Sequence, residues 1–445
     1  MFIFPKNLYT DVRIENVCLN QIAYRNGELL QSLNRNQKGA FIRIFDGHRW
    51  YYSSTTNMDR IQEEIDKLAL MAKENEDILD NPIVKKFEVN KGEYLYFKDK
   101  DISNVKYEDK LQLLKSYFPI IENVEDIKMW RAIYIDRKII KEFYSSKGAE
   151  LKFDYQTCGI ALRYGLNVDG KTFNGKYDKT STSFDDLKGL EENIKEIIER
   201  DIEFVKHAKP IKPGKYTVVF SPTATGVFTH ESFGHKSEAD FMIGDETMMK
   251  EWAIGKKVGA DNLSIVDTGD ILGSGFVPFD DEGTKSRKTY LIKDGLLSGR
   301  LHSIITAESL NEDLTGNARA VNFEYEPIVR MTTTYIEPGE KTKEELISEI
   351  KEGILIVDVN HGSGMSTFTI APSISYMIRD GKIAEPVNIS VISGNVMETL
   401  YEIDGISKEM EIVTFTLGGC GKMDQFPLPV GMGGPYIRVN NVNVQ

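Results

Sequence analysis

The chain has 445 residues, more than one ordinary hydrophobic core accommodates, so its length predicts two domains. Its formal net charge is −13, and because no block of Lys and Arg interleaved with aromatic residues interrupts this acidic background, nucleic acid is excluded as an expected partner. No apolar run reaches the length of a signal peptide or a membrane span and only three cysteines occur, so we expect a protein of the reducing cytoplasm that does not enter membranes.

The first half of the sequence combines strand and helix patterns. Apolar and polar residues alternate over residues 8–55 between the turn-forming segments 25–27, 36–39 and 46–48, which predicts a β-meander. Spacing of apolar residues predicts further elements: helices at 57–79, near 107–122 and at about 184–207, and strands at about 127–180. Residues 1–210 are therefore expected to form an α+β domain.

A proline-containing connector at 209–214 follows, and we place the domain boundary between residues 210 and 211. Residues 216–220 then predict a short strand, and Ser221 and Pro222 begin a helix. The rest is rich in short strands and glycine turns, with two hairpins that turn on Asp-Gly and one helix near 342–352. Residues 211–445 are therefore expected to form a largely antiparallel β domain.

The strongest functional motif lies in the helix predicted at the start of this second domain. His230 and His235 are five residues apart, and Glu231 directly follows the first histidine. Two imidazoles and a third protein ligand can hold a divalent metal with one position open for water, and a carboxylate beside them can accept a proton from that water. The motif therefore predicts a zinc hydrolase with His230 and His235 as ligands.

The spacing of the two histidines places a demand on the helix. In a regular helix, residues five apart diverge by about 140°, so the two imidazoles could not meet at one ion. A π-type turn or an early helix end between residues 223 and 236 would bring them together, and Gly234 would ease that distortion.

The third ligand is less well determined by the sequence. The candidates are Cys420, His361, Glu238 and Asp240. We favour Cys420, because glycines on both sides free the backbone to approach a site closely and Lys422 favours the thiolate. The other cysteines, Cys18 and Cys158, lie in apolar strands and are expected to pack in the core.

These residues resemble the TldD/PmbA family of metallopeptidases, once described as modulators of DNA gyrase. The resemblance is specific from about residue 215 onward and mostly architectural before it. It rests on the following segments: 230–235 with the acidic residues Glu238 and Asp240, then 279–284, 315–319, 364–388 and 419–422. Ala239 departs from the glycine that the family pattern would have there, so no role is carried over to its two acidic neighbours.

The family resemblance implies a zinc site formed by His230, His235 and Cys420, with Glu231 as the general base. It also implies hydrolysis of unfolded or short peptides by a dimer, either a homodimer or a heterodimer with a relative that lacks the motif. Two other functions stay open at this point. The chain could be a metal-bearing binding subunit without activity, or a zinc hydrolase of a non-peptide amide.

Overall fold

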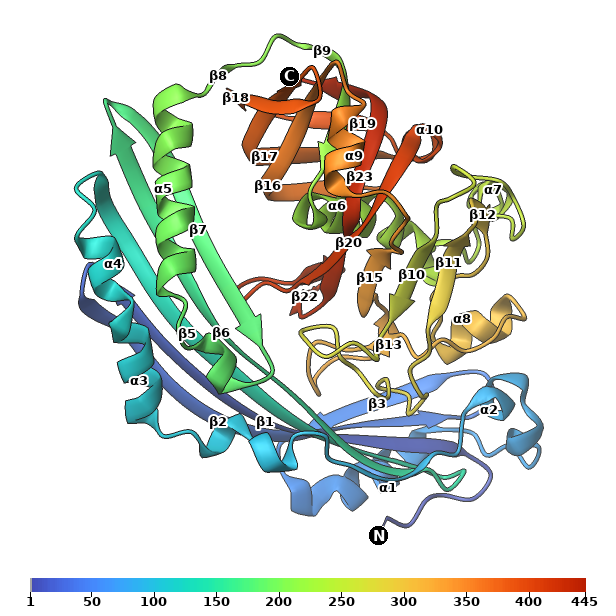
Figure 1. Ribbon diagram of the computed structural model, residues 1–445. Helices are drawn as coiled ribbons and strands as arrows, with labels where there is room; N and C mark the ends of the chain where they lie inside the picture. The colour runs from blue at the N-terminus through green and yellow to red at the C-terminus, as the bar shows by residue number, and fades with distance from the viewer. Residues whose placement is uncertain (1) are drawn as a thin grey trace.

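The computed structural model describes residues 2–445 and contains two large β-sheets with helices packed on them (Figure 1). The first sheet has seven strands in the order β3-β2-β1-β5-β6, and both β4 and β7 pair with β6. Its strands are β1 (Tyr9–Arg25), β2 (Glu28–Phe45), β3 (Trp50–Thr55), β4 (Lys91–Tyr94), β5 (Ile127–Ser145), β6 (Glu150–Val168) and β7 (Lys171–Ser181). The mixture of sheets and helices confirms the α+β class.

The helices of this first part are amphipathic and cover the sheet. In α1 (Ile61–Met71), the buried residues Ile61, Ile65 and Leu68 lie on one face and pack against β2. In α5 (Glu191–His207), Ile194 and Ile198 contact the core over β6, while acidic residues at the start and basic residues at the end complement the helix dipole. The others are α2 (Pro82–Lys86), α3 (Tyr107–Ser116) and α4 (Phe118–Glu122).

The structure corrects three local predictions in this part. Residues 36–39, expected as a turn, lie inside β2 and pair with residues 15–18 of β1. Gly39 is needed there because the Phe323 ring packs against its Cα, where a Cβ would lie 2.4 Å from the ring. The α-helix predicted to reach residue 79 ends at Met71, and Cys18 is only partly buried, whereas Cys158 is in the core as predicted.

The second sheet has twelve strands and is mostly antiparallel, as predicted. The path runs β12-β11-β10-β15-β23-β9-β16-β17-β18-β8, with β19 and β20 paired beside it. Its strands are β8 (Lys209–Pro210), β9 (Gly214–Phe220), β10 (Ile265–Thr268), β11 (Thr289–Lys293), β12 (Leu296–Leu297), β15 (Thr333–Ile336), β16 (Glu352–Gly364), β17 (Thr367–Arg379), β18 (Lys382–Asn388), β19 (Ile392–Asn395), β20 (Ile403–Val413) and β23 (Gly431–Val444).

Two small ribbons and several short helices complete the second part. The ribbons are β13 (Ala318–Arg319) with β14 (Ile328–Val329), and β21 (Cys420–Lys422) with β22 (Gln425–Leu428). The helices are α6 (Pro222–Thr229), α7 (Glu246–Glu251), α8 (Ile304–Ser309), α9 (Lys343–Ser348) and α10 (Val396–Tyr401). Of these, α6 and α9 lie where helices were predicted, whereas α7, α8 and α10 were not predicted.

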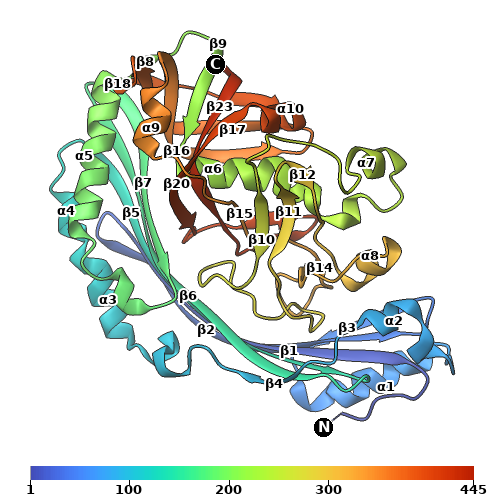
Figure 2. The same cartoon turned by 45° about the vertical axis from the view of Figure 1, so that its right-hand side comes forward.

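The long first sheet curves around the second part of the chain, and α3, α4 and α5 lie on its outer face (Figures 1 and 2). Loops of the second part, including the β21–β22 ribbon, reach toward the inner, concave face. We keep the domain boundary between residues 210 and 211 as a proposal; β8, directly before it, already pairs with β18 of the second sheet. Among residues 2–445, no helix has both the length and the apolar character that a membrane span requires.

Candidate metal centre

Helix α6 forms the base of the site and is buried at every position except Thr223, which is half-buried. The Ser221 hydroxyl caps it by accepting a hydrogen bond from the Ala224 N–H, and Pro222 occupies its first turn. Gly226 lies against β23 so closely that a Cβ there would be 2.7 Å from the Gly433 nitrogen. The helix is therefore fixed firmly against the second sheet.

At its end, α6 changes into a π-helical turn over His230–Gly234. The N–H of His235 donates to the carbonyl of His230, five residues back, which is the hydrogen-bond pattern of a π-helix. The two imidazole rings are thereby brought to the same side, with centroids 5.0 Å apart. A Cβ at Gly234 would lie 2.1 Å from the Met331 sulfur, so glycine fits where the turn packs. The predicted π-type turn is confirmed.

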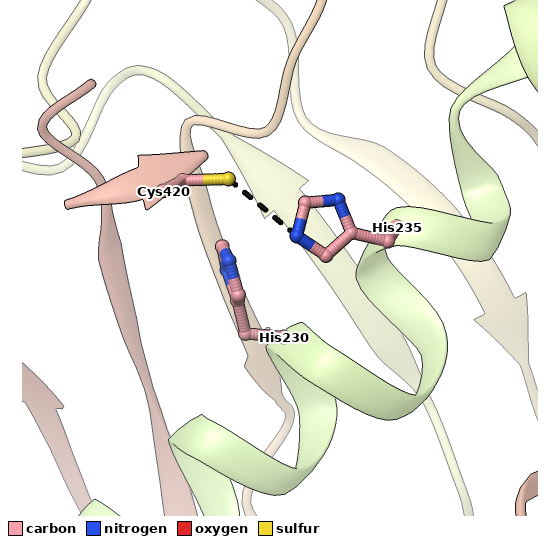
Figure 3. Close-up of side chains that lie close together, drawn as sticks. All are labelled: His230, His235 and Cys420. Atoms are coloured by element: carbon pink, nitrogen blue, oxygen red, sulfur yellow. Dashed lines mark hydrogen bonds between the residues drawn. The ribbon is translucent and has the colours of Figure 1, made fainter. Parts of the chain in front are cut away.

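Cys420 comes from a distant part of the chain and meets both histidines (Figure 3). Its Sγ lies 3.5 Å from His235 Nε2, and one ligand atom from each of the three residues lies within 4.8 Å of the others. The main chain around Cys420 is held by Arg330, which donates to the Cys420 carbonyl at 2.7 Å. Gly419 adopts φ +155°, and a Cβ there would clash with the Leu428 carbonyl.

The first sheet helps to hold the loop that carries Cys420. Leu417 packs on Ala23, Ile133 and Ala161, which lie side by side on β1, β5 and β6. The Thr416 hydroxyl lies 2.9 Å from the hydroxyl of Thr180 on β7. Both halves of the chain therefore position this cysteine.

A buried carboxylate orients the second histidine. Glu238 Oε2 accepts from His235 Nδ1 at 3.2 Å, which leaves Nε2 directed toward Cys420. Lys422 Nζ lies 3.1 Å from the same Glu238 oxygen and 2.7 Å from Asp240. Burial acts to raise the pKa of Glu238, but the hydrogen bond from His235 and the charge of Lys422 hold it below its usual value.

The cysteine has the protonation state that metal binding needs. Burial acts to raise the pKa of the Cys420 thiol, but hydrogen bonds from His230 and His235 and their charges lower it to about 5. Burial acts to lower the pKa of His235. Its hydrogen bonds to Cys420 and Glu238 act in the opposite direction and are stronger, so the pKa of His235 is raised. A thiolate is therefore favoured, and a metal would replace the proton on His235.

These residues fit a zinc ion. Bond lengths of about 2.3 Å to sulfur and 2.0–2.1 Å to nitrogen at a tetrahedral angle separate the two ligand atoms by about 3.5 Å, the distance between Cys420 Sγ and His235 Nε2. His230 Nδ1 is buried and has no hydrogen-bond partner among residues 2–445. A thiolate and two imidazoles are a donor set that zinc prefers and that leaves a fourth position open.

Glu231 lies beside this group and lines the same cavity. Burial raises the pKa of its carboxyl, partly offset by the two neighbouring histidines. Strand β16 packs against it through two glycines, since a Cβ at Gly362 would lie 3.0 Å from Glu231 Cγ and one at Gly364 would lie 2.6 Å from its carbonyl oxygen. A carboxylate with a raised pKa in a cavity is suited to general-base work.

The three alternative ligands do not belong to the group formed by His230, His235 and Cys420. Glu238 and Asp240 bind Lys422, and His361 is exposed on the cavity wall outside the group of three. Sequence reasoning did not identify Glu238 and Lys422 as partners, because the ion pair joins positions that are far apart in the chain. It also missed the contact of Leu417 with the first sheet, for the same reason.

A cavity of about 790 Å³ lies between the two parts of the chain. His230, Glu231, His235 and Cys420 line one wall, and residues of β5, β6 and β7 line the other. This volume falls within the range of small-molecule and peptide sites.

The chain is similar to known metallopeptidases along most of its length. Residues 213–445 match the PmbA/TldA metallopeptidase C-terminal domain, and residues 10–75 match domain 1 of the same metallopeptidases. A metalloprotease of Synechocystis sp. is 32% identical, with 98% of this chain and 94% of the relative covered. A zinc metalloprotease TldD homolog of Saccharolobus solfataricus is 28% identical, with 98% and 96% covered.

Solved structures share the fold. A modulator of a DNA gyrase from Thermotoga maritima has a TM-score of 0.79 at 20% identity, with 98% of this chain and 96% of that chain covered. TldE from Thermococcus kodakarensis has a TM-score of 0.76 at 16% identity, with 98% and 96% covered.

Proposed function

Because the chain belongs to the PmbA/TldD family of metallopeptidases, we propose that it is a zinc-dependent peptidase that hydrolyses unfolded or short peptides. The observation that carries this proposal is the meeting of His230, His235 and Cys420 beside Glu231 on the wall of one cavity. His230, His235 and Cys420 would hold the ion. When bound, zinc supplies Lewis acidity that polarises a carbonyl and acidifies water.

The protein side chains have distinct tasks in this proposal. Glu231 accepts the proton of the attacking water and can pass it to the leaving amine, as a carboxylate of raised pKa does in general acid–base catalysis. Glu238 holds His235 by its Nδ1–H. The thiolate contributes negative charge to the site and makes it sensitive to oxidation, which suits a reducing compartment.

The placement of the cavity supports a preference for extended substrates. The curved first sheet lies opposite the site, so a folded protein would have to enter between the two parts of the chain (Figure 2). An extended peptide can enter such a space and pair its backbone with a strand edge. We also propose that the chain works as a dimer, either with a second copy or with a motif-less relative, and that it acts in the cytoplasm.

The test combines metal analysis with proteolysis. We expect one zinc per chain by elemental analysis, lost or much reduced in His230→Ala, His235→Ala and Cys420→Ala. The zinc-loaded protein should cleave a reduced, unfolded protein and leave its native form intact, while a panel of small amides stays uncleaved. Equal cutting of native and unfolded forms would contradict the enclosed site. Zinc without any cleavage would favour a binding subunit, and cleavage of small amides alone would favour a non-peptide hydrolase.

A further inference from the structure

A row of cations crosses the concave face of the first sheet beside the metal centre. Arg131 on β5 is directly opposite Arg163 on β6, which in turn is directly opposite Lys176 on β7. Arg25 on β1 continues the row on the other side of Arg131. Like charges in directly opposed positions destabilise a sheet, so this arrangement needs either compensating acids or another role.

Compensation by acids is incomplete. Arg163 pairs with Asp178 at 2.9 Å, and Lys176 pairs with Asp358 at 3.2 Å. Arg131 is exposed, and its guanidinium has no ion-pair or hydrogen-bond partner among residues 2–445. One cation of the three on β5, β6 and β7 is therefore left without a counter-charge.

This free cation lies in the proposed active-site cavity. Arg131, Arg163 and Lys176 line the wall opposite His230, Glu231 and Cys420, whereas Arg25 does not line the cavity. The row lies two residues along the strands from the patch where Leu417 docks, about 7 Å away on the same face. Leu417 and Cys420 line the same cavity as the cations, so the cations and the metal centre border one continuous space.

We propose that Arg131, supported by Arg163, binds a carboxylate of the peptide substrate and so aligns the peptide across the metal centre. The proposal rests on the peptidase function above and names the substrate class more closely. A guanidinium offers a planar fork of donors that matches a carboxylate in a bidentate way, and partial enclosure in a cavity strengthens such a pair. The carboxylate can be the C-terminus of the peptide or the side chain of an Asp or Glu.

The experiment measures binding with cleavage suppressed. The probe is an unstructured decapeptide of Ala and Ser with an N-terminal fluorophore, made in four forms that combine a free or amidated C-terminus with Glu or Gln at three central positions. Dissociation constants are measured by fluorescence anisotropy with zinc-loaded Glu231→Gln protein and with the same protein carrying Arg131→Gln, Arg131→Lys or Arg25→Gln. Since Arg131 is exposed, its replacement should leave the fold intact, which circular dichroism checks.

We expect the Arg131→Gln change to weaken binding of a carboxylate-bearing peptide by about 10- to 100-fold, the usual value of a charge-assisted hydrogen bond. The amidated Gln peptide should bind equally to the Glu231→Gln protein with and without Arg131→Gln. For the carboxylate-bearing peptide, Arg131→Lys should retain part of the affinity and Arg25→Gln should have no effect. The form that loses affinity identifies which carboxylate is bound.

Equal affinity of all four peptides for the parent protein, or an equal loss for charged and neutral peptides in Arg131→Gln, would overturn the proposal. These outcomes are distinct from failure of the peptidase function, which would appear as no cleavage of any peptide by the protein with Glu231 in place.

Discussion

At the scale of single residues, the site separates side chains that would hold the metal from side chains that act beside it. His230, His235 and Cys420 converge with ligand atoms within 4.8 Å of one another, while Glu231 faces the same cavity without belonging to that group. Glu238 is fully buried, contacts His235 and does not line the cavity. This arrangement assigns different consequences to the replacement of each glutamate.

Replacement of Glu231 should abolish most peptide cleavage without affecting zinc binding. Glu231→Gln keeps the size of the side chain but removes its ability to accept a proton, so we expect peptide cleavage to fall by about 10²-fold or more. Zinc content and thermal unfolding should stay at the level of the unmodified protein, as elemental analysis and calorimetry would check. Undiminished cleavage would show that another group takes the proton.

Replacement of Glu238 should instead weaken zinc binding. Without this acceptor the His235 ring loses its fixed orientation and part of its basicity, so we expect Glu238→Ala to lower zinc affinity by about 10- to 100-fold. Competition with a chromophoric chelator measures this affinity. Asp240→Asn is a matched control, because Asp240 contacts Lys422 without contacting a histidine, and its effect should be smaller. An unchanged affinity in Glu238→Ala would argue against the orienting role.

At the scale of elements, two local structures bring the three candidate ligands together: a π turn and a docked loop. The π turn at the end of α6 aligns two histidines that a regular helix would separate. The Cys420 loop reaches the same point because its preceding residues dock on the first sheet through Leu417 and Thr416. The π turn lies within the second part of the chain, whereas the position of the Cys420 loop depends on contacts with the first sheet.

The contact of the Cys420 loop with the first sheet should therefore strengthen zinc binding. Leu417→Ala removes the side chain that packs on Ala23, Ile133 and Ala161, and the loop should then sample more conformations. We expect weaker zinc binding with an otherwise intact fold, measured by chelator competition and circular dichroism. Phe426→Ala on the adjoining β22 is the control, since that ring is 64% exposed. Equal zinc affinity in the two variants would mean that the sheet does not support the ligand.

At the scale of the whole molecule, buried ion pairs join the first sheet to the loop at residues 279–284. Asp281 pairs with Lys141 of β5 and lies 3.7 Å from Arg13 of β1. Glu282 pairs at 2.9 Å with Arg43 of β2. All five side chains are buried. Because a buried charge is stable only with its partner, these pairs resist separation of the sheet from the second part.

The Asp281 pair makes a prediction about pH. Burial acts to raise the pKa of Asp281, but Lys141 and Arg13 lower it below the usual value of about 4. Since a depressed pKa stabilises the fold above the unfolded-state pKa, this contribution is complete above about pH 4 and is lost as the pH falls toward the folded-state pKa. Asp281→Asn should therefore cost about 3–5 kcal/mol at pH 7 and less at pH 3.

Urea unfolding of both proteins at pH 7, 5 and 3 measures this difference. Lys67→Ala, which breaks an exposed pair with Glu64, should change the free energy of unfolding by about 1 kcal/mol or less at each pH. A cost of Asp281→Asn that stays constant from pH 7 to pH 3 would contradict the assigned direction.

Local patterns in the sequence were sufficient for much of the fold. The alternation in β1 and β2, the helical spacing in α1 and α5 and the Asp-Gly turns all depend on neighbours within a few residues, so they can be read from the chain. Residues 36–39 show where this fails. Their polar and glycine composition is typical of a turn, but pairing with β1 and packing against Phe323 keep them in a strand.

The sequence by itself determined the spacing of His230 and His235, the neighbouring Glu231 and the need for a π turn, because helix geometry links residues five apart. Only the tertiary structure decided that Cys420, and none of His361, Glu238 and Asp240, meets the two histidines. It also decided that the cation row on β5, β6 and β7 faces the same cavity. The physical reason is that these contacts join segments more than 50 residues apart, whose meeting depends on how two sheets pack and leaves no periodic trace in the chain.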